Sequence, residues 1–128
     1  MTVQDLIKST LRLIGAIGQG EEPTTAELTD AMTALNLMLD SWQNSGYISP
    51  VQYSDLLTDI KHAKSLQRAF RYNLAIEIAP EYGITISAEV LAMATKAMQV
   101  IRNAHIEMPE ATFDIPITDN GWYDGRKS

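Results

Sequence analysis

Hydrophobic residues near the start of the chain recur with the period of an amphipathic helix. One face of this helix carries Val3, Leu6, Ile7, Leu11 and Ile14. Thr2 stands before it as a cap, because a threonine hydroxyl can accept a hydrogen bond from a free backbone N–H of the first turn. The pattern predicts a helix over residues 3–14, ended by Gly15, Gly18 and Gly20.

A second helix is predicted directly after this glycine-rich turn. Thr24 and Glu27 have the spacing of a capping box, in which each side chain bonds to the backbone N–H of the other residue. Asn44, Ser45 and Gly46 close the helix. Its apolar stripe consists of Leu28, Met32, Leu35, Leu39 and Trp42, widened by Met38. The two helices form an αα-hairpin with a turn of about nine residues.

The second half of the chain contains two more helical patterns. Residues 46–63 lack such a pattern, and Pro50 interrupts their strand-prone residues, so we expect an irregular loop or a short extended segment there. The third helix is predicted over 64–79 and ends at Pro80. The fourth begins after a cap at Ser87 and ends near residue 107. Its apolar side carries Val90, Leu91, Ala94, Ala97, Met98, Ile101 and His105.

These elements predict an all-α fold: a four-helix bundle over residues 1–108, followed by an extended C-terminal arm over 109–128. The expected core is Leu6, Leu35, Leu39, Trp42, Phe70, Leu74, Leu91, Met98 and Ile101. The arm alternates apolar and polar residues and contains Pro116, so it lacks the pattern of a helix. Five of its side chains are expected to seek a partner surface: Phe113, Ile115, Ile117, Trp122 and Tyr123.

Composition and charge narrow the possible functions. The 128 residues suit a single globular domain, with 45% hydrophobic and 20% charged residues. Sixteen acidic residues against ten basic ones give a net charge of −6, which disfavours binding to DNA phosphates. The chain has no apolar run long enough for a membrane span, and its first residues lack the pattern of an export signal, so we expect neither.

Candidate catalytic and metal-binding patterns are scarce. The chain has no cysteine, which excludes a disulfide framework, a thiolate zinc site and a thiol nucleophile. His62 and His105 belong to no metal-binding motif, and His105 suits a core or interface position. The glycine-rich turn follows a helix and lacks the ending of a phosphate-binding loop. Glu77 and Glu81 flank Pro80 and are interpreted as solvated carboxylates. We therefore expect no metal, no cofactor and no enzymatic activity.

One group of charges stands out in the third helix. Lys61, Lys64, Arg68 and Arg71 recur at helical spacing, so they form a basic stripe if this helix begins one turn early. The stripe is either a solvated face, or a contact with an acidic face of a neighbouring subunit or partner, or a surface that faces passing DNA. The acidic excess of the chain favours a contact between subunits over contact with nucleic acid.

Two stretches of the chain resemble phage head-to-tail connector proteins. The first, residues 2–42, is similar to their N-terminal helical hairpin and reads TVQDLIKSTLRLIGAIGQGEEPTTAELTDAMTALNLMLDSW. The second, residues 71–83, resembles a segment of the tail accessory factors of short-tailed phages, which close the portal after DNA packaging; it reads RYNLAIEIAPEYG. The resemblance extends over about residues 2–108. It departs at 46–63, where many relatives insert a β-hairpin.

This resemblance implies a structural virion protein without enzymatic activity. Copies of a helical bundle would form a ring of about twelve subunits below the portal protein, extend the DNA channel and help to retain packaged DNA. Packaged DNA would pass without sequence-specific contact, and the next tail component would bind below the ring. The arm would reach the portal or a neighbouring subunit. The expected location is the head–tail junction of the virion, after synthesis in the host cytoplasm, with no membrane partner.

Two other functions remain open from the residues alone. A small helical DNA-binding regulator is the alternative, because αα-hairpins also build helix-turn-helix domains. Against it, the predicted turn is longer than the ~3–4 residues of that motif, and the second helix carries no lysine or arginine. A wall-degrading virion enzyme would require a pair of carboxylates in a cleft.

Overall fold

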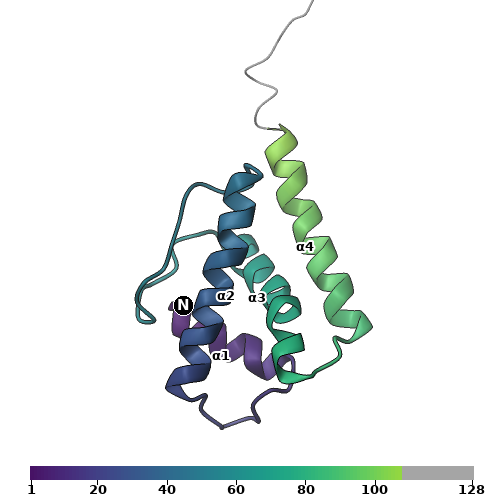
Figure 1. Ribbon diagram of the computed structural model, residues 1–128. Helices are drawn as coiled ribbons and strands as arrows, with labels where there is room; N and C mark the ends of the chain where they lie inside the picture. The colour runs from purple at the N-terminus through teal and green to yellow at the C-terminus, as the bar shows by residue number, and fades with distance from the viewer. Residues whose placement is uncertain (108–128) are drawn as a thin grey trace, which may run out of the picture.

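A computed structural model describes the backbone of residues 1–107 and the side chains of residues 1–104. The described part is mostly helical and contains no strand, which confirms the all-α class. A single antiparallel bridge joins Thr2 and Asp59. The helices are α1 (Val3–Leu13), α2 (Thr25–Asn44), α3 (Lys64–Ile78), the short 3-10 helix η1 (Ala79–Tyr82) and α4 (Ala88–Glu107) (Figure 1).

The predicted helix starts are confirmed. The Thr2 hydroxyl accepts from the Asp5 backbone N–H, and the Asp5 carboxylate accepts from the Thr2 backbone N–H, both at 3.1 Å. Thr24 and Glu27 form the same reciprocal pair at the start of α2. Ser87 accepts from the backbone N–H of Val90 at the start of α4. Capping satisfies backbone donors that have no partner inside the helix.

Helix α3 is the centre of the packing. It contacts α1, α2 and α4, whereas α2 and α4 do not contact one another within the described residues (Figure 1). Phe70 and Leu74 of α3 are completely buried, and the rings of Phe70 and Trp42 lie 5.6 Å apart between centroids. The core thus forms where the apolar side chains of α3 meet those of the helices that cover it.

Most of the predicted core is buried, but the prediction for Leu91 is wrong. Leu91 is 53% exposed, and Met98 is half-buried against the core. The reason is that, in the described part of the chain, α4 has only α3 as a neighbouring α-helix, so only a narrow stripe of α4 is covered. Val90, Ala94 and Ile101 lie on that stripe, and Leu91 projects about 100° away from Val90 around the helix.

Residues 45–63 form an irregular connection, as predicted, yet they contribute to the core. Tyr53 and Ile60 are only 6% and 3% exposed. The end of the connection is attached to the start of the chain, because the backbone N–H of Val3 donates to the Thr58 carbonyl at 3.0 Å. These hydrogen bonds allow a segment without regular structure to cover the helices.

Candidate functional site

Three cations of the predicted basic stripe lie on α3. Lys64 opens the helix and is exposed, Arg68 is exposed one turn later, and Arg71 is half-buried. Lys61 precedes the helix, and its ammonium group is 3.9 Å from the Asp59 carboxylate. The helix does not begin a turn early, so the condition under which Lys61 would join the helical stripe is not met.

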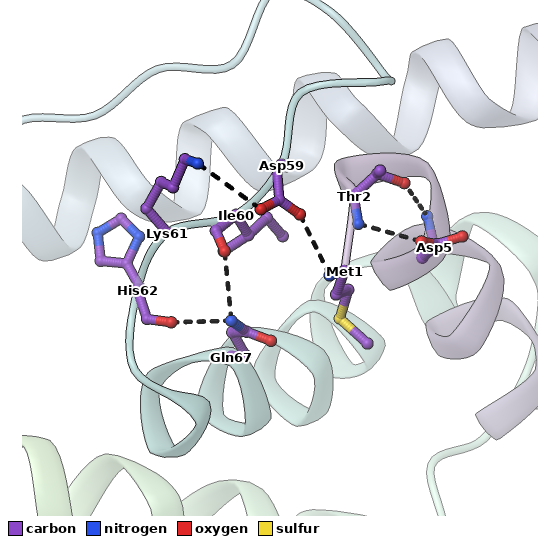
Figure 2. A network of polar contacts seen from close by, with 8 residues as sticks. All are labelled: Met1, Thr2, Asp5, Asp59, Ile60, Lys61, His62 and Gln67. Atoms are coloured by element: carbon purple, nitrogen blue, oxygen red, sulfur yellow. Dashed lines mark hydrogen bonds and ion pairs between the residues drawn. The ribbon is translucent and has the colours of Figure 1, made fainter.

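Hydrogen bonds keep the segment before α3 out of the helix. Figure 2 shows the Gln67 side-chain amide close to the backbone carbonyls of Ile60 and His62, to which it donates at 3.4 and 2.8 Å. The backbone N–H of Ile60 donates to the Met1 carbonyl at 2.9 Å. The Met1 ammonium group also lies 3.2 Å from the Asp59 carboxylate (Figure 2). The N-terminus and Gln67 together hold residues 59–62 in a non-helical conformation.

Arg68 and Arg71 differ in their surroundings although both approach Tyr72. Their guanidinium carbons lie 5.7 and 5.4 Å from the centre of the Tyr72 ring, within the range of cation–π interactions. Arg68 also approaches the Met93 sulfur on α4 at 3.8 Å. The Nε atom of Arg71 is buried and has no hydrogen-bond partner among the described residues. The Arg68 side chain therefore lies on the surface, whereas the Arg71 side chain is partly packed within the fold.

The exposed cations of α3 line a groove against α4. We call it the α3–α4 groove; its volume is about 340 Å³ and its lining is Lys64, Ser65, Arg68, Met93, Lys96, Ala97 and Val100. Within residues 1–104 no carboxylate forms an ion pair with Lys64, Arg68 or Lys96. The groove thus combines apolar side chains with three cations that repel one another, which is an environment suited to an acidic partner with an apolar centre.

Lys96 was missed by the sequence analysis, which followed the cations of the third helix alone. The packing of α4 on α3 places Lys96 beside Lys64 and Arg68. One signal was available in the sequence: residues 60–76 and 90–106 contain cations and no carboxylate. Because α3 and α4 lie within these two segments and pack together, three of their positive charges gather at one seam.

A second hollow continues the α3–α4 groove toward the end of α4. Its volume is about 600 Å³, and it shares Ser65 and Val100 with the first. Residues 46–49 form one of its walls, and Leu66 and Ile101 contribute apolar surface. The two hollows form one long, mainly apolar depression with cations at one end.

The opposite charge collects on the side of α2. Residues 13–60 contain no lysine or arginine and seven carboxylates: Glu21, Glu22, Glu27, Asp30, Asp40, Asp55 and Asp59. Glu22 is paired with Lys8 at 2.6 Å and Arg12 at 3.6 Å, and the hydrogen bond from Lys8 lowers the pKa of the Glu22 carboxyl. Asp30 and Asp40 on the exposed side of α2 form no ion pair with described residues.

Within the described residues, the other candidate sites do not bring together side chains arranged to bind a phosphate or a metal. In the glycine-rich turn the Gly18 backbone N–H donates to the Glu21 carboxylate at 2.6 Å, so an acidic side chain occupies a donor that a phosphate would need. Glu77 and Glu81 are exposed, as predicted. No group of three potential metal ligands gathers within the described residues. In the same part of the chain, no helix has the length and apolar character needed to cross a membrane.

The predicted contact residues of the arm lie outside the described residues. They are Phe113, Ile115, Ile117, Trp122 and Tyr123. The side chain of His105 also lies outside them.

Comparison with known proteins identifies no family for this chain. No model of a known protein family matches it, and no curated protein is significantly similar to it.

Proposed function

We propose that this chain is a structural virion protein, one subunit of a head-to-tail adaptor ring that binds below the portal. In this proposal residues 1–108 form a four-helix bundle, and residues 109–128 form an extended arm that contacts the portal or a neighbouring subunit. The ring extends the DNA channel and helps to retain packaged DNA. The protein acts by assembly and not by catalysis.

The observation that carries the proposal is the separation of charge on either side of α3. Three cations without an ion pair to the described carboxylates lie in the α3–α4 groove, whereas α2 carries carboxylates and no cation. Two different, complementary surfaces on one subunit suit a contact that repeats from copy to copy, and such a contact closes into a ring when the rotation per subunit allows it. The basic residues of the stripe on α3 then serve contact between subunits.

The two stretches that resemble connector proteins belong to one packed unit. Residues 2–42 include α1 and most of α2, and residues 71–83 include the second half of α3 and η1. All three α-helices pack on one another. The resemblance is thus carried by a continuous part of the core, which supports a shared architecture.

The net charge of −6 suits a channel through which DNA must slide. A ring that bound phosphates tightly would hold the DNA in place, because each neutralised phosphate adds to affinity. An acidic subunit weakens such contacts and keeps them independent of sequence. The proposed partners are further copies of the chain, the portal and the next tail component, at the head–tail junction of a virion assembled in the host cytoplasm.

Co-sedimentation with the cognate portal ring tests the proposal. We expect the purified chain to pellet with portal rings in a fixed ratio. Without portal rings it should remain in the supernatant, at a centrifugal speed chosen so that rings of the chain alone do not sediment. Light scattering of the mixture should give a mass larger than the sum of a portal ring and one subunit. Absence of binding at high protein concentration and low salt would contradict the proposal.

A small DNA-binding regulator is the second candidate, because the α3–α4 groove is lined by three cations that form no ion pair with a carboxylate of residues 1–104. Against it, the connection from Ile14 to Thr24 is longer than the ~3–4 residues of a helix-turn-helix turn. Fluorescence anisotropy with labelled duplex DNA distinguishes the two. A regulator binds with a steep dependence on salt concentration, whereas we expect the adaptor to show no measurable binding at physiological salt.

A further inference from the structure

The exposed side of α2 has an apolar centre between two carboxylates. Leu37 is 68% exposed, although its neighbours Met38 and Leu39 are buried. Asp30 and Asp40 are exposed on the same helix and fall on the same side as Leu37, because positions three, seven and ten residues apart lie close together around a helix. We call Asp30, Thr33, Leu37 and Asp40 the α2 outer face.

The α2 outer face and the α3–α4 groove are complementary. The groove presents Met93, Ala97 and Val100, and Val100 is 54% exposed. Met93 and Val100 are about 10 Å apart along α4, and the two carboxylates are about 15 Å apart along α2. A helix that placed its leucine in the apolar part of the groove would bring Asp40 about 5 Å away on one side and Asp30 about 10 Å away on the other. Both carboxylates would then lie along the groove, whose lining includes three cations.

We infer that the α3–α4 groove of one copy receives the α2 outer face of a second copy of this chain. The partner is a second copy, because this same chain carries both the carboxylates that would balance the cations of the groove and the exposed leucine that would fill its apolar part. One copy cannot make this contact with itself, since α3 lies between α2 and α4 (Figure 1). Each copy keeps one unused surface after pairing, so the contact adds subunits one after another. Closure of this series into a ring rests on the proposed function; the pairwise contact does not.

Cysteine cross-linking tests the contact directly, because the chain has no cysteine of its own. Leu37→Cys and Val100→Cys are prepared as separate full-length proteins, mixed and treated with a mild oxidant. We expect a disulfide-linked dimer from the mixture, several-fold more abundant than from either variant alone. The matched control is Leu57→Cys, an exposed leucine outside both surfaces at 71% exposure, mixed with Val100→Cys.

The pattern of cross-linked dimers shows which part of which chain occupies the α3–α4 groove. A dimer from Leu37→Cys alone, equal to that from the mixture, would mean that α2 pairs with α2 and would overturn the inference. So would equal yields with Leu57→Cys, or no dimer at all. A different result is expected if residues 109–128 occupy the groove instead. The two cysteine variants of the full chain should then cross-link no more than the control pair does. The same variants in a chain that ends at Met108 should cross-link more than in the full chain.

Charge reversal supplies a second, independent measurement. Asp30→Lys with Asp40→Lys in one protein, and Lys64→Glu with Lys96→Glu in another, should each lose self-association in sedimentation velocity. Mixing the two should restore it, because the reversed surfaces attract one another. Glu77→Lys with Glu81→Lys is the charge-matched control at exposed positions outside both surfaces and should associate as the unaltered chain does.

Failure to recover association on mixing would overturn the inference. If the groove instead binds nucleic acid, the Lys64→Glu and Lys96→Glu protein should lose binding to labelled duplex DNA while its self-association is unchanged. Both experiments are made without the portal. Failure of the contact between copies is therefore distinguishable from failure to bind a portal.

Discussion

The side chain of Asn36 bonds to the backbone of Tyr53 in both directions. Its amide nitrogen donates to the Tyr53 carbonyl at 2.8 Å, and its amide oxygen accepts from the Tyr53 N–H at 2.9 Å. A side-chain amide thereby replaces the strand partner that an extended segment would otherwise need. This pair attaches the irregular connection to the middle of α2 and holds the Tyr53 ring in the core.

Asn36→Ala should lower the free energy of unfolding by about 1–3 kcal/mol, because it leaves the N–H and carbonyl of Tyr53 without partners. Urea denaturation followed by circular dichroism measures this loss. Asn44→Ala is the control, since Asn44 is exposed at the end of the same helix. Equal denaturation midpoints for the two variants would mean that water replaces the lost bonds.

Trp42→Ala should cost about 3–5 kcal/mol of stability by leaving a cavity beside Phe70. Trp42 is only 7% exposed and its ring packs at a tilt on Phe70. Leu37→Ala on the same helix removes an exposed side chain and should change the unfolding free energy of the monomer by less than about 0.5 kcal/mol. Thermal unfolding at low protein concentration compares the two, and a similar loss for both would contradict the assignment of the buried face.

Stability should fall on acidification through Asp5 and Glu22. Hydrogen bonds from the backbone and side chain of Thr2 lower the pKa of Asp5, and the hydrogen bond from Lys8 lowers that of Glu22. The unfolded chain then binds more protons than the folded chain below the ordinary values of 3.8 and 4.5. The stabilisation is complete at neutral pH and is lost as the pH falls through the lowered, folded-state pKa values.

Asp5→Asn removes one of these titrations, so the acid decrease of the unfolding free energy should become shallower. Glu77→Gln is the matched control, because Glu77 is an exposed carboxylate outside both interactions. Urea midpoints measured from pH 7 to about pH 3 provide the comparison. An identical pH profile for Asp5→Asn and the unaltered chain would refute the role of this capping box in acid stability.

Arg68→Glu and Arg71→Glu should differ in their effects on folding. The exposed Arg68 should tolerate reversal within about 0.5 kcal/mol and lose only salt-sensitive association. Arg71 is half-buried with a buried Nε atom, so a carboxylate there should cost roughly 1–3 kcal/mol of stability. Chemical denaturation of both variants checks this, and equal stabilities would place Arg71 with the surface cations.

A chain that ends at Met108 should keep its helical circular dichroism and its cooperative unfolding, but should lose co-sedimentation with the portal ring. The residues removed include Phe113, Ile115, Ile117, Trp122 and Tyr123, whose burial against a partner would contribute about 1.5–3 kcal/mol for each large side chain. The control is the full chain with Arg126→Ala and Lys127→Ala. Unchanged portal binding by the truncated chain would transfer the contact to the helices.

The sequence by itself determined where the helices begin and where they end. For most of the helices it also determined which face is buried. Thr2, Thr24 and Ser87 cap their helices as predicted, and the pattern of α2 places Leu35, Leu39 and Trp42 in the core. These features follow from residues within one or two helical turns. A cap needs a side chain beside free backbone donors, and a buried face needs only the helical period.

The tertiary structure alone decided which surfaces come together. Lys96 joins the cations of α3, and Leu91 remains exposed, because α4 packs on α3 and on no other α-helix of residues 1–107. Lys61 lies outside the helical stripe because Met1, which is distant in sequence, bonds to the segment that contains Lys61. Such outcomes depend on contacts between residues far apart in the chain, and a local pattern contains no information on which distant group will supply the partner.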